Sequence, residues 1–378
     1  DELNLLCSMT AHGINPNIHT IARICNPDYT DQVYKMQKTF ALSLTVNPEK
    51  QAAIEIERLL KFPGFLKRDS FAKGRVEIVE LRVDERSRLS NVALSELNRV
   101  IKCRVLVCAV LRRGDVVAPD GSFVLREGDR IFVTASTESL ATLLDNLGII
   151  TKKVNHVMIC GGGRVSYYLA QQLEKDGMTV RLIEKDPKHC EELAALLPKT
   201  EIINDDASNT FVLKRENLES CDALVTATGM DELNMIISLY GTKHGVSQVI
   251  TKLGHMENGS MIDQLPIGST IWPKDLCCNG IVRYIRAMHN QTGAAVSVHS
   301  IADGKAEAIE FHVEEKKPYC DKPLKNMKVK QNILVACITH GGVTELPGGD
   351  SVIREGDTVV VVTTRNDIIY KLDDIFEA

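Results

Sequence analysis

The sequence predicts an α/β fold in which doubly wound, parallel Rossmann-like sheets alternate with small α+β domains, the whole plan being repeated in tandem. Three observations predict it. Short apolar strands alternate with helices between residues 156 and 253, as in a parallel sheet covered by helices on both faces. The tetrapeptide Arg-Glu-Gly-Asp occurs at 126–129 and at 354–357, each time before a β-rich apolar run. The stretch DELN occurs at 1–4 and again at 231–234.

The matching stretches occur in the same order in both copies. Between the DELN and Arg-Glu-Gly-Asp pairs, HTIAR (19–23) resembles QVITK (248–252), and VEIVEL (76–81) resembles AEAIEF (306–311). A single shared hairpin would not produce similarity over such a length, so we interpret the chain as a tandem duplication. The tetrapeptide is then the turn of one module used twice, and Gly128 and Gly356 are expected to supply its positive φ.

An amphipathic helix is predicted after each Arg-Glu-Gly-Asp run, because apolar residues recur there at helical spacing. These apolar positions are Leu140, Leu143, Leu144 and Leu147 in the first copy and Ile369, Leu372, Ile375 and Phe376 in the second. Two further helices, over 48–61 and 273–288, each begin with Pro. We expect them to cross to the next domain or to form a dimer contact.

The second copy extends upstream of its DELN stretch to Val154, whereas nothing before Asp1 matches this part in the first copy. We expect the first copy to lack its front, including its own glycine-rich loop, through truncation or an incomplete gene model. The expected domains are a partial Rossmann-like domain with its crossover helix (1–72), a small α+β domain (73–150), a second Rossmann-like domain (153–288) and a second small domain (292–378).

A glycine-rich loop opens the second Rossmann-like domain. The apolar strand HVMIC (156–160) is followed by GGGRVS (161–166) and by a helix that Gly177 can end. The strand TVRLI (179–183) comes next and ends on Glu184, 23 residues after Gly161. A strand, glycine-rich turn, helix, strand and acid in this order predict a dinucleotide-binding site.

Each part of this motif has a physical role. Gly161 allows the tight turn, and Gly163 lacks the Cβ that would keep a phosphate from the backbone amides. The helix N-terminus offers free N–H donors and a positive dipole end. Glu184 can accept hydrogen bonds from ribose hydroxyls and would repel a 2′-phosphate, which favours NAD(H) or an adenine nucleotide over NADP(H). Ser166 replaces the third glycine of the motif and is small enough to fit there.

Further strands are predicted at 201–204, 222–228 and 248–253, and a helix at 187–197 begins after Asp186 as N-cap. The ligand of such a sheet lies over the carboxyl ends of its strands. Asp206 is expected at the adenine end, Ala227 and Thr228 beside the phosphates, and Lys252 as a cation that neutralises a phosphate. The predicted site residues are Gly161, Gly162, Gly163, Arg164, Val165, Glu184, Asp206, Ala227, Thr228 and Lys252, with Arg23 as the counterpart of Lys252 in the first copy.

Composition and missing motifs argue against several function classes. The formal net charge of −5 gives no electrostatic reason to expect nucleic acid as a partner. No apolar run approaches the roughly 18 residues of a membrane span. The eleven cysteines include no CxxC pair, which is typical of free thiols in a reducing cytoplasm. The sequence holds no paired histidines, HExxH, GxSxG or Walker lysine, so we expect a nucleotide sensor and not an enzyme.

Two other functions stay open at this point. An NAD-dependent oxidoreductase with an unusual substrate domain would need an acid/base pair beside the nicotinamide. A redox-sensing DNA-binding protein would need a basic helix-turn-helix, which no segment supplies.

The stretch from Met158 to Pro198, the DELN motif and the small domain with Arg-Glu-Gly-Asp together resemble the RCK/KTN family of potassium-transport regulators. The resemblance implies N-type units that bind NAD(H) and ATP or ADP. It also implies a homo-oligomeric ring, a dimer or tetramer, on the cytoplasmic face of the cell membrane. There the ring would act on a TrkH-like potassium-translocating subunit.

The family's binding motif falls on Gly161 to Val165, Glu184, Asp206, Ala227 and Thr228, and on Arg23 in the partial first unit. One departure is Asp205-Asp206, where the family has Gly-Asp. The extra carboxylate could lower anion affinity or select among nucleotides. The absent first glycine-rich loop is the other departure, and it decides whether one or two nucleotide sites exist per chain.

Overall fold

The computed structural model of the chain describes residues 1–61, 65–72, 75–83, 87–147, 153–254, 262, 265–288, 295–302, 304–364 and 369–377. The chain divides into two compact units. Unit 1 consists of residues 1–63 and 152–281, and unit 2 of residues 64–151 and 282–378. Among the described helices, none combines the length and the apolar character that crossing a bilayer requires.

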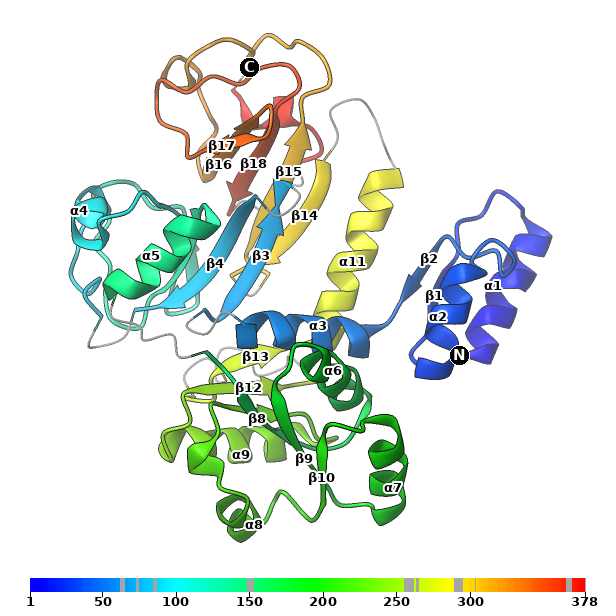
Figure 1. Cartoon of the computed structure of the whole chain (residues 1–378). Coiled ribbons are helices and arrows are strands. Elements are labelled where there is room, and N and C mark those ends of the chain that lie inside the picture. Colours follow the sequence, from blue (N-terminus) through cyan, green and yellow to red (C-terminus); the bar gives the residue numbers. More distant parts are fainter. Residues whose placement is uncertain are drawn as a thin grey trace. The chain divides into compact units, whose positions relative to one another are not determined.

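The larger part of unit 1 is a doubly wound sheet of six parallel strands in the order β10-β9-β8-β11-β12-β13 (Figure 1). Numbered from β8, this is the 3-2-1-4-5-6 order of Rossmann folds. Its elements are β8 (His156–Cys160), α6 (Arg164–Lys175), β9 (Thr179–Glu184), α7 (Pro187–Leu196), β10 (Glu201–Asn204), α8 (Thr210–Arg215), η3 (Leu218–Ser220), β11 (Ala223–Thr226), α9 (Asp231–Lys243), β12 (Gln248–Lys252) and β13 (Ser269–Ile271). The predicted parallel α/β fold is confirmed.

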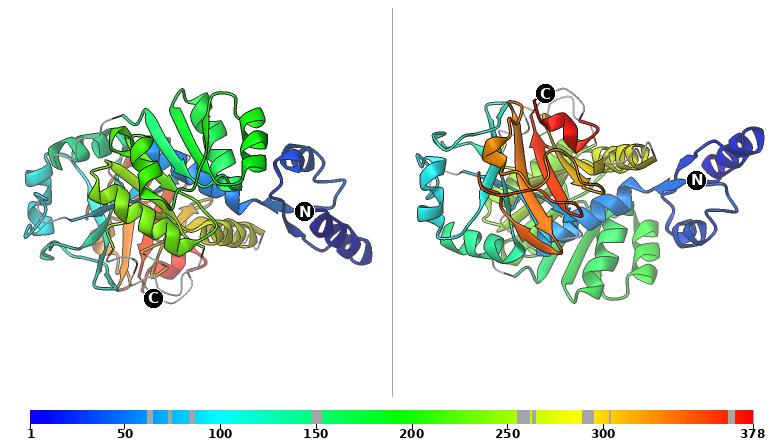
Figure 2. Two further views of the ribbon diagram at one scale, coloured as in Figure 1. Left: turned by 90° about the horizontal axis from the view of Figure 1, so that it is seen from below. Right: turned by 90° about the horizontal axis from the view of Figure 1, so that it is seen from above.

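Helices cover both faces of this sheet, as the further views in Figure 2 also show. The apolar residues of α6 pack on one face, and those of α8 and α9 pack on the other. The start of α7 follows the prediction: Pro187 is its first residue, and the Asp186 side chain accepts a hydrogen bond from the Lys188 amide at 3.0 Å.

The first copy in unit 1 consists of α1 (Glu2–Ile14), β1 (Ile21–Arg23), α2 (Pro27–Lys35), β2 (Leu44–Val46) and α3 (Pro48–Lys61). The asparagine of the DELN motif makes the equivalent hydrogen bond in both copies. Asn4 Nδ2 donates to the Arg23 carbonyl at 2.8 Å, and Asn234 Nδ2 donates to the Lys252 carbonyl at 2.9 Å. Each motif therefore ties its helix to the end of the following strand, as a duplication requires.

The helix predicted at 48–61 is α3, which packs on α6 within unit 1, and residues of both belong to one buried cluster. Polar contacts fix this packing. The Tyr168 hydroxyl donates to the Cys25 carbonyl at 3.1 Å and accepts from Asn47 Nδ2 at 3.2 Å. Gln248 Nε2 donates to the Leu59 carbonyl at 2.7 Å. The first copy is thus bound to the second Rossmann sheet. The helix predicted at 273–288 is α11 (Pro273–Met288), and its role as a crossover or a dimer contact stays a prediction.

Unit 2 contains two five-stranded antiparallel sheets with the same topology, β3-β4-β7-β5-β6 and β14-β15-β18-β16-β17. The first sheet is built from β3 (Lys67–Phe71), β4 (Val76–Arg82), β5 (Leu106–Arg112), β6 (Asp115–Val117) and β7 (Arg130–Ala135), with η2 (Leu94–Glu96), α4 (Leu97–Ile101) and α5 (Thr137–Leu147). The second is built from β14 (Ala295–Ile301), β15 (Ala306–His312), β16 (Ile333–His340), β17 (Val343–Glu345) and β18 (Thr358–Thr363), with η4 (Leu324–Asn326) and η5 (Leu372–Ile375). Identical strand order in both sheets confirms the tandem duplication.

The Arg-Glu-Gly-Asp tetrapeptide is a structural turn in both sheets. Gly128 has φ +84° and Gly356 has φ +86°, as predicted. The final aspartates, only 1% and 3% exposed, accept hydrogen bonds from the amides of the turn's own arginines. Asp129 also pairs with the Arg112 guanidinium at 2.7 Å, and Asp357 pairs with His340 Nδ1 at 2.7 Å.

The helix predicted after the second tetrapeptide is largely wrong. In the first copy, α5 forms, and Leu140, Leu143 and Leu144 are buried. In the second copy, residues 365–368 lie outside the described part, and the only helical turn described after it is the 3₁₀-helix η5. Leu372 and Ile375 are buried there nonetheless, so a single turn satisfies the apolar positions.

Candidate functional site

Parallel strands bring the predicted residues to one edge of the six-stranded sheet. Asn204 lies opposite Glu184 on the neighbouring strand, Cys160 lies between Ile183 and Thr226, and Thr226 lies opposite Thr251. The loops that follow β8, β9, β10, β11 and β12 therefore leave the sheet on the same side. All the predicted site residues except Arg23 are on these strand ends and loops or in the first turn of α6.

The three glycines of the loop meet different surroundings. Gly161 has φ +97°, and a Cβ there would lie 2.8 Å from Thr228 Cα. A Cβ on Gly162 would lie 2.7 Å from Leu193 Cδ1 and 3.0 Å from Glu184 Cγ. A Cβ on Gly163 would meet no atom within 4 Å. Gly161 is therefore required by packing against backbone, Gly162 is crowded by two side chains, and Gly163 borders open space.

Gly163 is the N-cap of α6 and has no side chain with which to cap the amides of the first turn. The first helical bond runs from the Tyr167 amide to the Gly163 carbonyl at 3.0 Å. The preceding amides, including those of Arg164 and Val165, lie at the positive end of the helix dipole. Ser166, in place of the third glycine, is fully buried.

The Glu184 carboxylate lies at the predicted ligand-binding edge of the sheet and also fixes the glycine-rich loop. Its Oε2 accepts from the Gly162 amide at 2.7 Å, and its Oε1 accepts from the Asp186 amide at 2.9 Å. A carboxylate offers about four acceptor positions, so about two remain for hydroxyl donors. The ribose-binding role predicted for Glu184 stays a prediction, and the loop contact is a second role that the sequence did not indicate.

His189, on α7, also contacts the loop and was missed from the sequence. Its Nε2 lies 2.9 Å from the Gly162 carbonyl, and its Nδ1 lies 3.1 Å from Glu192 Oε2. The hydrogen bond to Glu192, together with the Gly162 carbonyl and against the effect of burial, raises the pKa of His189 above its ordinary value. No motif flags this residue, because its contact depends on how α7 packs beside the loop.

The extra carboxylate of Asp205-Asp206 is compensated by an arginine. Asp205 Oδ2 accepts from Arg215 Nη2 at 2.9 Å, and the Asp206 amide and Arg215 lower the pKa of Asp205. Asp206 Oδ1 accepts from the Ser208 amide at 2.8 Å, and hydrogen bonds from Ser208 lower its pKa. Both carboxylates are therefore ionised at neutral pH, with Asp205 already paired.

Thr228 and Lys252 are joined through Asn234, the last residue of DELN. The Thr228 amide and hydroxyl both donate to Asn234 Oδ1, at 2.9 and 2.7 Å. Lys252 Nζ donates to the Thr228 carbonyl at 2.7 Å. Burial lowers the pKa of Lys252, against the opposing effect of Asp231 and Glu49. Ala227 is 4% exposed and offers only backbone. Asn234 was not predicted as part of this edge.

Arg23 stands apart from the other predicted residues, since it ends β1 in the two-stranded sheet β1-β2. Its Nη2 pairs with Glu49 Oε1 at 2.6 Å, and its side chain is 56% exposed. Glu49, on α3, also acts on the pKa of Lys252. Glu49 thus pairs with Arg23 and acts on Lys252 only electrostatically, within unit 1.

Metal chemistry finds no support in the described part of the chain, where no group of three or more His, Cys, Asp or Glu side chains could hold an ion.

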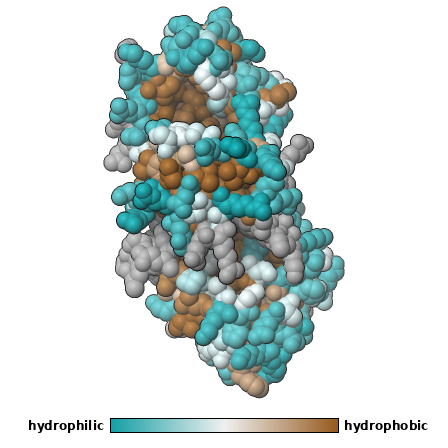
Figure 3. All heavy atoms as spheres, turned by 90° about the vertical axis from the view of Figure 1, so that its left-hand side faces the viewer, coloured by the Kyte–Doolittle hydropathy of each residue, from teal (hydrophilic) through white to brown (hydrophobic). Residues whose placement is uncertain are grey.

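The eleven cysteines are free thiols, and burial raises the pKa of most of those whose pKa is shifted, such as Cys25, whose pKa is about 11. On the face drawn in Figure 3, apolar residues gather in patches between hydrophilic ones.

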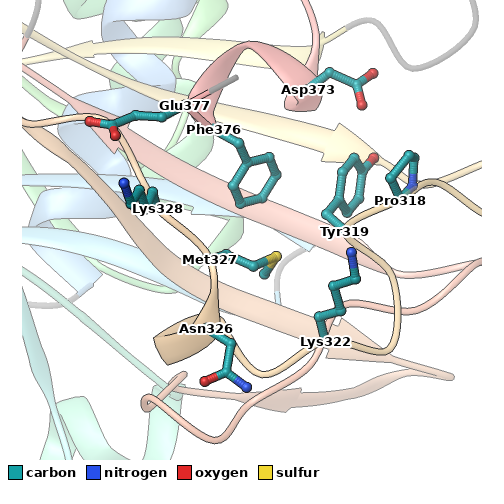
Figure 4. A pocket seen from close by; sticks show the side chains of 9 residues that line it. All are labelled: Pro318, Tyr319, Lys322, Asn326, Met327, Lys328, Asp373, Phe376 and Glu377. Atoms are coloured by element: carbon teal, nitrogen blue, oxygen red, sulfur yellow. The ribbon is translucent and has the colours of Figure 1, made fainter.

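A cavity of about 360 Å³ lies in unit 2, in the second antiparallel domain. Figure 4 shows its lining, which is Pro318, Tyr319, Lys322, Asn326, Met327, Lys328, Asp373, Phe376 and Glu377. Met327, in its lining, is extended, whereas the first copy has the helix α4, whose Leu97 and Ile101 are buried, after its own 3₁₀ turn. The two lysines and two acids balance, so the lining selects no ligand charge.

Known protein families match both kinds of domain in the chain. Residues 157–273 match the TrkA-N domain, and residues 78–148 and 308–376 each match the TrkA-C domain. The chain is 28% identical over 368 residues to the Trk system potassium uptake protein TrkA homolog 1 of Methanosarcina mazei, covering 96% of this chain and 81% of that protein. It is 26% identical over 385 residues to the Trk system potassium uptake protein TrkA of Haemophilus influenzae, covering 100% of this chain and 82% of that protein.

Solved structures share the fold. The crystal structure of the GsuK RCK domain aligns with a TM-score of 0.57 at 14% identity, covering 95% of this chain and 75% of that one. The GsuK channel bound to NAD aligns with a TM-score of 0.55 at 14% identity, covering 95% of this chain and 62% of that one.

Proposed function

Because the chain belongs to the TrkA family, we propose that it is a regulatory subunit of a potassium-uptake system and binds NAD(H) at its glycine-rich loop. The observation that carries the proposal is the open space at Gly163. It lies beside uncapped helix amides, one residue from the loop amide that Glu184 fixes. Phosphates bind such amides, and a carboxylate at the end of the second strand is suited to a ribose.

NAD(H) is the preferred ligand for two reasons. Glu184 carries a negative charge where NADP(H) would place its 2′-phosphate. A relative of the same fold, the GsuK channel, has been solved with NAD bound. ATP and ADP share the adenosine and phosphate groups that this edge would contact, so they are competing ligands in the same binding experiment.

A sensor is favoured over an oxidoreductase by how the edge is built. Thr228 and Asn234 are joined by a hydrogen bond, Lys252 bonds to the Thr228 carbonyl, and His189 contacts the Gly162 carbonyl of the loop. The role of these polar side chains is therefore to position the backbone. The relatives, moreover, are named for potassium uptake. We propose that ligand binding biases a conformational equilibrium, with a coupling of about 1–3 kcal/mol.

We extend the same proposal to the oligomeric state, the cellular location and the membrane partner. A homo-oligomer of this chain, a dimer or tetramer, would lie on the cytoplasmic face of the membrane and contact a TrkH-like potassium-translocating subunit. The net charge of −5 offers nucleic acid no counterpart.

The first test is calorimetric titration of the whole chain with NAD⁺, NADH, ATP and ADP. Glu184→Ala is compared with Glu201→Ala, because Glu201 begins β10 and so lies at the opposite edge of the sheet. We expect Glu184→Ala to weaken NAD⁺ by about tenfold or more, equal to about 1.4 kcal/mol, and Glu201→Ala to leave it unchanged. Equal affinities in both variants would remove Glu184 from the site.

The second test separates regulation from catalysis. Potassium flux through vesicles that hold the membrane subunit is measured with the chain, with and without nucleotide. A flux that ignores the nucleotide would contradict regulation. A substrate-dependent change in NADH absorbance would favour the oxidoreductase instead.

A further inference from the structure

The two ring nitrogens of His189 both face groups that only accept hydrogen bonds. Nε2 lies 2.9 Å from the carbonyl oxygen of Gly162, and Nδ1 lies 3.1 Å from the carboxylate oxygen of Glu192. A neutral imidazole has one N–H and one lone pair, so it can satisfy only one of these partners. The imidazolium, with two N–H groups, satisfies both. A neutral Nε2–H tautomer could hold Gly162 alone, so it is the two contacts together that favour the imidazolium.

The contact to Gly162 has a consequence for the next residue. The peptide unit between Gly162 and Gly163 is planar and trans, so its carbonyl and its N–H point in opposite directions. Holding the Gly162 carbonyl towards α7 turns the Gly163 N–H away from α7. A Cβ on Gly163 would meet nothing within 4 Å, so the space on the Cβ side of this residue is open.

The preceding peptide unit is held as well, since the Gly162 amide donates to Glu184 at 2.7 Å. Two consecutive peptide units of the loop are thus oriented by two side chains from elsewhere in the chain. Glu184 orients the first and His189 orients the second.

We propose that His189 is a proton-linked positioning residue of the nucleotide site: as an imidazolium it holds the Gly162 carbonyl and so presents the Gly163 N–H to a ligand phosphate. This inference rests on the proposed nucleotide-binding function and adds its regulation by pH.

The charges around His189 determine the direction of the effect. Glu192 of its own helix and Glu184 from β9 act on it, the glycine loop contributes a carbonyl, and the net result is a pKa raised above the ordinary 6.5. A bound pyrophosphate adds negative charge to the same loop and raises this pKa further. The protonated form therefore binds the ligand more tightly, and affinity falls as pH rises through the pKa of His189, above 6.5.

NAD⁺ is the suitable probe, because its phosphates are diesters and keep their charge, whereas the terminal phosphate of ADP or ATP titrates near pH 6. The dissociation constant is measured calorimetrically from about pH 6 to about pH 9 for the whole chain, for His189→Gln and for Glu192→Gln. His189→Gln keeps a hydrogen-bond donor but cannot titrate. Thermal unfolding of each variant confirms that it is folded.

The wild type is expected to lose about fivefold or more in NAD⁺ affinity across this range. His189→Gln is expected to show no such slope. In Glu192→Gln the slope is expected to move to lower pH, because the carboxylate that favours the imidazolium is gone. An NMR titration of the His189 ring, without and with NAD⁺, should show a higher pKa in the complex.

Each contrary result has a definite meaning. A flat wild-type profile, or a slope that survives in His189→Gln, would overturn the role of His189 and leave nucleotide binding standing. A wild-type chain that binds no NAD⁺ at any pH would overturn both proposals. An NMR pKa at or below 6.5 in the free protein would show that the imidazolium is not the form that holds the loop.

Discussion

A methyl group added at Gly161 should destabilise the protein, whereas one added at Gly163, two residues further along the loop, should weaken binding. Gly161 has φ +97°, and a Cβ there would lie 2.8 Å from Thr228 Cα and 2.9 Å from the Thr228 amide nitrogen. Those atoms are backbone and cannot rotate away. Gly163 has φ −64°, and its Cβ would meet nothing within 4 Å. Gly163→Ala is therefore the matched control for Gly161→Ala.

The expected magnitudes follow from these contacts. In Gly161→Ala, a side chain at positive φ costs about 1–2 kcal/mol and forced packing costs about 1–3 kcal/mol, so unfolding should be easier by about 2–5 kcal/mol. In Gly163→Ala, loss of the preferred N-cap is offset by the lower entropy of the unfolded alanine chain. The net change in the free energy of unfolding should stay within about 1 kcal/mol.

In Gly163→Ala the expected effect is on binding and not on stability. Its new methyl group would occupy the space proposed for the phosphates, so NAD⁺ affinity should fall by about tenfold or more while the protein stays folded. Urea unfolding gives the stability of each variant, and calorimetry gives the affinity. Wild-type affinity in Gly163→Ala would place the phosphates elsewhere, and wild-type stability in Gly161→Ala would refute the close approach of the loop to Thr228.

Three further outcomes are expected. Asp129→Ala should lower the free energy of unfolding by about 2–4 kcal/mol, because it leaves Arg112 and a turn amide without their buried acceptor; a loss below about 0.5 kcal/mol in urea would contradict this. Asp205→Gly should change NAD⁺ affinity by less than about threefold, since Asp205 is already paired with Arg215, a cation that it shares with Glu216; a larger gain would show that Asp205 repels the ligand. The folded pKa of His189 is raised, so its contribution to stability is complete below pH 6.5 and is lost as pH rises through the folded pKa. Urea unfolding at low and high pH should show this loss in the wild type and not in His189→Gln.

Much of the Rossmann sheet was predictable because each strand is a short apolar run between turn residues. The predicted strands 156–160 and 201–204 coincide with β8 and β10, and the predicted helix at 187–197 ends one residue later than α7. The turn at Gly128 and Gly356 was predictable for a similar reason, since only local backbone geometry is involved. Signals of this kind act over a few residues and are readable without a tertiary structure.

The polar contacts at the sheet edge were not predictable in this way. His189 reaches the loop over 27 positions, and Asn234 joins Thr228 to Lys252 from a motif that the sequence indicated only as a repeat. The apolar pattern at 369–376 likewise predicted a helix, yet Phe376 pairs with the extended Val329 instead. Periodicity states which side chains will be buried, and it does not state which backbone form will bury them.

By itself, the sequence determined the duplication, the parallel α/β order and the position of the glycine-rich loop, because repeats, apolar periodicity and glycine act locally. Only the tertiary structure decided that Gly161 and Gly162 are held by packing while Gly163 faces open space, and that Glu184 and His189 orient the peptides between them. Those facts depend on which segments, distant in the sequence, come within hydrogen-bonding distance of one another in the folded chain.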